Sequence, residues 1–235
     1  MTRAAIETIP PIIVRKSFML KILHLILQII YVTIFIYTKG VKRMLSIAAG
    51  MMIAIGGIIF LTLSGLEGAL LFSMGLLTIL CLKLELFTGK AGLLATKEIT
   101  PGKLLEIWIG NFIGTFGMAL MLLLTPRGIE LSNKAMEIVA VRLANGFFVN
   151  LIYGIFCGML MFMSVKTWQF TNGNPFYAMM PVGIFIVCGF NHCVADMFYL
   201  HMGCLHISDY LVLIPTTIGN LIGCNIIPWA INQSS

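Results

Sequence analysis

The chain has 235 residues, of which 59% are hydrophobic and only 10% are charged, and its mean hydropathy is +1.00. A soluble domain of this length cannot bury so much apolar surface, so the composition excludes a soluble globular protein and indicates a polytopic, all-α membrane protein. The formal net charge of +6 does not require a nucleic-acid partner, because an excess of Lys and Arg on the cytoplasmic side accounts for most of it.

The first apolar run, residues 18–37, is ambiguous between a span and a surface helix. Lys21, His24 and Gln28 fall on one side of a helix and form a polar stripe. This pattern favours an amphipathic helix that lies in the membrane interface, although a true span stays open. We therefore expect residues 1–43 to be an N-terminal interfacial segment.

Six later runs are long enough to cross a bilayer, which takes about 20 apolar residues. They are residues 44–64, 69–95, 103–124, 138–164, 176–200 and 209–231. Since they fill most of the chain, we expect residues 1–235 to form a single integral membrane domain with two halves, 44–124 and 125–235.

The distribution of Lys and Arg predicts the orientation of these spans. With six spans and the N-terminus inside, the outer side holds only Arg127 and Lys134, and the other basic loop residues face the cytoplasm. We therefore expect both termini to be cytoplasmic and the protein to lie in the cell membrane.

Two of the predicted spans contain polar, glycine-bearing interruptions, CLKLELFTGKAG at 81–92 and CGFNHCVADMFY at 188–199. Their polar side chains are Glu85, Thr88, Lys90, His192 and Asp196. Hydrocarbon does not tolerate irregular backbone or charge unless these line a cavity or pathway. The interruptions therefore predict the working parts of a channel or transporter.

An internal repeat relates the two halves of the chain. IGNFIGT at 109–115 returns as IGNLIGC at 218–224. With three spans in each half, the second half enters the membrane in the opposite sense, which gives a 3+3 inverted repeat. The interrupted spans are the second and the fifth, which occupy corresponding positions.

Four segments resemble the formate/nitrite transporter family: LFSMGLLTILCLKLELFTGK (71–90), WIGNFIGT (108–115), GFNHCVADMF (189–198) and PTTIGNLIGC (215–224). The resemblance implies an aquaporin-like fold, a homo-pentamer in a lipid bilayer, and one pore per protomer. The substrates it implies are small monovalent anions such as formate, nitrite or hydrosulfide, with no cofactor.

The resemblance also implies roles for individual residues. The pore or substrate residues would be His192, Thr88, Asn220, Asn150 and Lys134. The apolar constrictions would be Phe72, Leu76, Phe87 and Phe185. We expect the residues that support the helix breaks to be Glu85, Lys90, Asn191 and Asp196. The chain departs from the family pattern at Asn191, where an acidic residue is usual, and at Lys90, which leaves the preferred anion open.

Asp196 has two possible roles, as an ionic partner that fixes its break or as a proton relay. Lys83, Lys90 and Arg142 are the basic residues that could pair with the carboxylates of the two breaks.

A small anion that enters a low-dielectric constriction loses its hydration, at an idealised cost on the order of 20 kcal/mol for an ion. Hydrogen-bond donors can replace the lost water, or the anion can cross as the neutral acid. Histidine suits either task, so we expect His192 to donate a hydrogen bond or a proton midway. Passive and proton-coupled transport both remain open.

Two other functions compete with this prediction. A neutral-solute channel of aquaporin type is disfavoured because the chain lacks paired Asn-Pro-Ala motifs. An intramembrane enzyme that uses Cys193 and His192 is disfavoured because adjacent helical residues point about 100° apart. The six cysteines form no CxxC pair, so the sequence indicates neither a metal site nor a disulfide framework.

Overall fold

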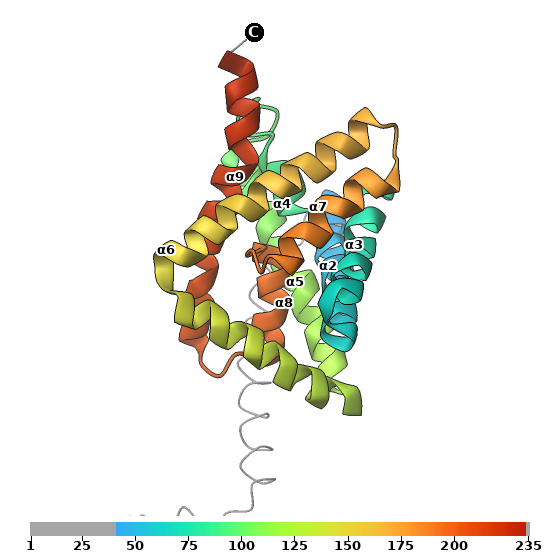
Figure 1. Ribbon diagram of the computed structural model, residues 1–235, viewed down its shortest axis with the longest axis vertical. Coiled ribbons are helices and arrows are strands. Elements are labelled where there is room, and N and C mark those ends of the chain that lie inside the picture. The colour runs from blue at the N-terminus through green and yellow to red at the C-terminus, as the bar shows by residue number, and fades with distance from the viewer. Residues whose placement is uncertain (1–40, 234–235) are drawn as a thin grey trace, which may run out of the picture. The chain divides into compact units, whose positions relative to one another are not determined.

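The computed structural model describes residues 41–233. The expected interfacial helix within residues 18–37 therefore lies outside the described part. The described residues belong to one compact unit that begins at Val41, and every regular element in it is helical (Figure 1).

The elements in chain order are α2 Val41–Leu63, α3 Gly65–Cys81, α4 Phe87–Ala91, α5 Pro101–Leu123, α6 Pro126–Phe170, α7 Pro175–Val187, α8 Cys193–Gly203, the 3-10 helix η2 Ile207–Val212, and α9 Leu213–Gln233.

Within the described residues, four helical segments are long and apolar enough to cross a membrane, namely Arg43–Leu63, Pro101–Leu123, Pro126–Phe170 and Ile207–Asn232. The apolar helices α3 and α7 are shorter. Within the expected spans 69–95 and 176–200, the chain leaves the helical conformation after Cys81 and after Val187, and resumes it at Phe87 and at Cys193.

Helix α6 is longer than the predicted span 138–164. It begins at Pro126, where the Thr125 hydroxyl accepts a hydrogen bond from the backbone N–H of Gly128 and caps the first turn. Within α6, Gly146 has φ 68° and ψ −174°, so two helical arms meet there at a bend (Figure 1). The sequence predicted neither the early start nor this bend.

Glycines allow two pairs of long helices to approach closely. A Cβ on Gly114 of α5 would lie 2.0 Å from the carbonyl oxygen of Ile47 in α2, and a Cβ on Gly223 of α9 would lie 2.0 Å from that of Ile155 in α6. Backbone contact of this kind is typical of membrane helices, where small residues mark the interfaces. Close backbone contacts thereby join α2 to α5 and α6 to α9.

Candidate functional site

The first helix break is held by Asn111, which projects from α5. Its Oδ1 accepts a hydrogen bond from the backbone N–H of Phe87 at 2.8 Å. Its Nδ2 donates to the carbonyl oxygens of Ser46 at 2.7 Å and Glu85 at 2.9 Å. One buried side chain thus satisfies backbone groups that the end of a helix leaves unpaired.

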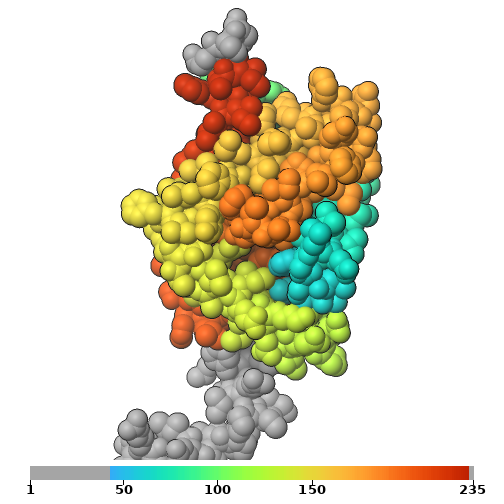
Figure 2. Space-filling view, viewed as in Figure 1, coloured from blue at the N-terminus to red at the C-terminus, as the bar shows by residue number. Residues whose placement is uncertain are grey.

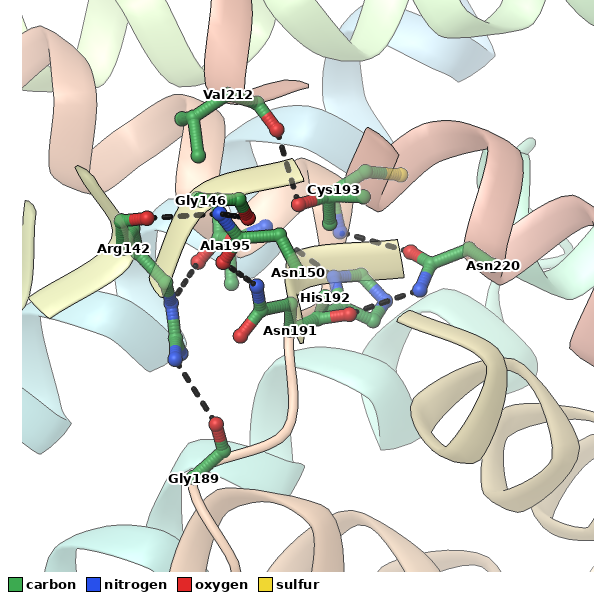
Figure 3. A network of polar contacts seen from close by, with 12 residues as sticks. Arg142, Gly146, Asn150, Gly189, Asn191, His192, Cys193, Ala195, Val212 and Asn220 are labelled. Carbon is green, nitrogen blue, oxygen red and sulfur yellow. Dashed lines mark hydrogen bonds and ion pairs between the residues drawn. The ribbon is translucent and has the colours of Figure 1, made fainter. Parts of the chain in front are cut away.

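The second break is held in the same way by Asn220, which projects from α9. Its Oδ1 accepts from the backbone N–H of Cys193 at 2.8 Å, and its Nδ2 donates to the carbonyl oxygen of Asn191 at 2.8 Å (Figure 3). Nδ2 also donates to the carbonyl oxygen of Gly154 at 2.8 Å. We call Asn111 and Asn220 the asparagine clamps. Asn220 is among the residues expected from the sequence and Asn111 is not, although the repeated Ile-Gly-Asn motif contains both.

A hydrogen bond joins the two breaks to each other. The Oγ1 atom of Thr88, in α4, lies 2.8 Å from Nε2 of His192, which caps α8. The Nδ1 atom of His192 accepts from the backbone N–H of Ala195 at 3.1 Å. A ring nitrogen that accepts carries no proton, so the ring is neutral in this arrangement and Nε2 donates to Thr88. The hydroxyl hydrogen of Thr88 then remains available to another acceptor.

A cavity of about 190 Å³ reaches His192 from one side. Phe72, Phe185, Arg142, Asp196 and Tyr199 are among its other lining residues. Figure 2 shows a hollow in the surface between α3, α6 and α7, where residues of α8 are visible. A path of this kind, apolar with a few polar groups, suits a small solute.

Aromatic rings form the wall of the cavity beside His192. The ring of Phe185 stacks on the imidazole with centroids 5.5 Å apart and an interplanar angle of 14°. Phe72 meets Phe185 edge to face at 6.3 Å. Of the four expected constriction residues, these two line the cavity, whereas Leu76 and Phe87 lie in the buried core.

Asp196 pairs with Arg142, one of the three basic residues that the sequence offered. Arg142 Nε lies 3.3 Å from Asp196 Oδ1, and Arg142 Nη1 donates to the carbonyl oxygen of Gly189 at 2.9 Å. The side chains are 12% and 2% exposed. The ion pair ties α6 to the second break within the wall of the cavity.

A family model described as formate/nitrite transporter matches residues 28–232. The chain belongs to the formate/nitrite transporter family. It is thus a membrane transport protein, and its relatives are channels rather than enzymes.

Two relatives are formate channels, both named FocA. That of Haemophilus influenzae is 27% identical, and the match covers 77% of this chain and 81% of the relative. That of Escherichia coli (strain K12) is 24% identical, and the match covers 76% of this chain and 80% of the relative.

Solved structures show the same fold. A pentameric formate channel with formate bound superposes with a TM-score of 0.70 at 23% identity, over 82% of this chain and 95% of that one. An FNT family ion channel superposes with a TM-score of 0.63 at 20% identity, over 80% of this chain and 87% of that one. The all-helical architecture is therefore that of the formate/nitrite transporter channels.

In this member of the formate/nitrite transporter family, two further asparagines tie the α6 bend to the second break. Asn191 Nδ2 donates to Asn150 Oδ1 at 2.7 Å. Asn150 Nδ2 in turn donates to the carbonyl oxygens of Arg142 and Gly146, both at 2.7 Å (Figure 3). Asn150 thus binds the backbone where the helical pattern of α6 is interrupted.

The remaining expected residues do not line this cavity. Glu85 lies 3.8 Å from Lys103 Nζ, rather than pairing with Lys83 or Lys90. Lys90 is half-buried in the last turn of α4. Lys134 donates to the carbonyl oxygen of Leu61 at 2.9 Å. The contacts of Glu85 and Lys134 thus join different segments of the chain, away from this cavity.

Proposed function

We propose that the protein conducts a small monovalent anion, such as formate, nitrite or a similar weak-acid anion, along a path in each protomer that passes His192. Membership of the formate/nitrite transporter family supports this proposal, as does similarity to formate channels. The observation that carries it is the hydrogen bond between Thr88 and His192. This bond connects the two helix breaks, and His192 also lines a cavity together with several aromatic side chains.

The chemistry of Thr88 and His192 supplies what a desolvated anion needs. Because His192 donates to the Thr88 oxygen, the Thr88 hydroxyl is oriented to donate its own hydrogen to a passing carboxylate or nitrite oxygen. Phe185 and Phe72 exclude bulk water on one side, which strengthens that hydrogen bond. If the anion takes a proton, it crosses as the neutral acid, whose desolvation cost is much smaller.

The architecture that we propose consists of six spans in two halves, 44–124 and 125–235, that enter the membrane in opposite senses. The second and fifth spans are interrupted. The two asparagine clamps support this repeat, because each reaches the first N–H of a short helix from the last span of its own half. The matching glycine contacts of α2–α5 and α6–α9 also support it.

We further propose that the protein is a homo-pentamer in the cell membrane with both termini in the cytoplasm. The pentameric formate channel of similar fold supports the assembly, and the distribution of Lys and Arg supports the orientation.

Proteoliposome flux measurements test the proposal. Formate, nitrite, hydrosulfide, acetate, chloride and glycerol are compared at two pH values, for the wild type and for His192→Asn. We expect flux of at least one weak-acid anion and none of glycerol, and we expect His192→Asn to change the selectivity or the pH dependence.

His206→Asn is the matched control, since His206 is exposed and caps η2, a position that asparagine also suits. The proposal fails if glycerol passes and the anions do not, or if His192→Asn behaves like His206→Asn at both pH values.

A further inference from the structure

Arg142 places a guanidinium group in the wall of the cavity that leads to His192. We propose that Arg142 is the anion-recognition residue of this cavity: a small monovalent anion binds its unused N–H groups before it reaches Thr88 and His192. The inference rests on the proposed function and assigns to Arg142 the preference for anions over neutral solutes.

The guanidinium of Arg142 has donors to spare. It carries five N–H groups, and within residues 41–233 it donates one to Asp196 from Nε and one to the Gly189 carbonyl from Nη1. Planar carboxylate and nitrite groups match the fork of a guanidinium, which binds two oxygens at once more strongly than a neutral donor does.

The backbone around Arg142 fixes the position of this group. Arg142 lies one turn before the bend at Gly146, and Asn150 binds the carbonyl oxygens of both residues. Its side chain is only 12% exposed and is held at two points (Figure 3). The side-chain entropy that a mobile surface arginine loses on binding an anion is therefore already lost here.

Asp196 holds Arg142 in position, and at the same time its negative charge repels an anion that binds Arg142. Its Oδ1 faces Arg142, whereas its Oδ2 has no hydrogen-bond partner among the described residues and is buried. An asparagine at this place keeps an oxygen for Arg142 Nε and removes the negative charge. Replacing Arg142 should therefore weaken anion binding, whereas replacing Asp196 by Asn should strengthen it. If the ion pair were purely structural, the two replacements would not act in opposite directions.

The cavity has room for the anion. A volume of about 190 Å³ exceeds many times the minimum of about 10–15 Å³ that a single water needs. An anion of the size of formate or nitrite fits beside Arg142 together with several waters.

The test compares Arg142→Gln, Arg142→Lys and Asp196→Asn in the full chain. Two quantities are measured: the concentration of formate and of nitrite that gives half-maximal flux in proteoliposomes, and the rise in unfolding temperature of the detergent-solubilised protein on addition of either anion. Titrations are run at constant ionic strength against sulfate. Arg127→Gln is the matched control, because Arg127 lies on the same helix and is 55% exposed.

We expect Arg142→Gln to raise the half-saturating concentration at least tenfold and to abolish the anion-dependent thermal shift. Arg142→Lys should lie between Arg142→Gln and the wild type, because the charge remains but the fork is lost. Asp196→Asn should lower the half-saturating concentration several-fold, and Arg127→Gln should leave it unchanged.

The inference is overturned if Arg142→Gln stays within twofold of the wild type in both measurements, or if Asp196→Asn weakens binding as Arg142→Gln does. If Arg142→Gln does not fold, the half-saturating concentrations and thermal shifts of Arg142→Lys and Asp196→Asn test the inference without it. A wild type that conducts no anion, yet is stabilised by formate through Arg142, would refute the proposed function and leave the binding site standing.

Discussion

Asn111 and Asn220 make the same three hydrogen bonds on different helices. Each accepts from the first N–H of a short helix, and each donates to two carbonyl oxygens, one of which belongs to the break itself. Both side chains are completely buried. They are therefore the structural basis of both helix breaks.

Replacing either clamp should destabilise the protein strongly. Asn111→Ala leaves the N–H of Phe87 and the carbonyl oxygen of Glu85 without their partner, at about 1–3 kcal/mol for each unsatisfied group. Asn220→Ala should have a similar effect. Thermal unfolding in detergent measures it, with Asn133→Ala as the control, because Asn133 is exposed on α6. Equal unfolding temperatures for Asn111→Ala and Asn133→Ala would contradict the clamp.

The contact between α5 and α2 predicts a sharp difference between two neighbouring glycines. A Cβ on Gly114 would meet the Ile47 carbonyl at 2.0 Å, whereas a Cβ on Gly117 has nothing within 4 Å. We expect Gly114→Ala to force the helices apart and to reduce the yield of folded, monodisperse protein several-fold. Gly117→Ala should leave the yield unchanged, and size-exclusion chromatography measures both. A normal elution profile and yield for Gly114→Ala would contradict the close approach.

The bend of α6 depends on a backbone conformation that only glycine adopts easily. Gly146 has φ 68° and ψ −174°, and a Cβ there would have nothing within 4 Å. Gly146→Ala therefore adds strain without a clash, at about 1–3 kcal/mol. We expect a lower unfolding temperature, and a displaced Arg142 that raises the half-saturating anion concentration.

Gly102→Ala is the control for this strain, because Gly102 lies in a helix and also has open space around it. Its unfolding temperature should stay the same or rise slightly. A Gly146→Ala protein as stable as Gly102→Ala would show that the bend is not strained.

Phe185 should limit the size of the solutes that pass. Its ring stacks on His192 and lines the cavity, so Phe185→Ala should widen the path and allow acetate and glycerol to pass. The glycerol permeability of proteoliposomes measures this, with Phe170→Ala as the control, since Phe170 is 90% exposed. Glycerol exclusion that persists in Phe185→Ala would assign the size limit to other residues.

Much of the site could be predicted because its chemistry is local in the sequence. Thr88 and His192 lie inside polar stretches that interrupt apolar runs. Such stretches cost free energy in a membrane and therefore indicate a functional site. The family resemblance then assigned Thr88 and His192 to the pore. The structure brings their side chains within 2.8 Å of each other, whereas their part in transport stays a prediction.

Other features could not be predicted, because they depend on contacts between distant residues. The sequence offered Arg142 only as one of three possible partners of the carboxylates in the breaks. It did not indicate the bend at Gly146, because a single glycine in an apolar run does not predict a bend. Thr125-Pro126 fits a turn as well as a helix start, so the first turns of α6 were missed. Asn111 lies in a long apolar run, and its place in the repeated Ile-Gly-Asn motif is the signal that could have indicated it.

The asparagine clamps belong to α5 and α9, whereas the residues that line the cavity come from α2, α3, α6, α7, α8 and the second break. The clamps themselves thus lie outside the lining. Mutations in the lining can alter which ion is preferred without removing either clamp, so substrate preference is free to diverge during evolution while the architecture persists.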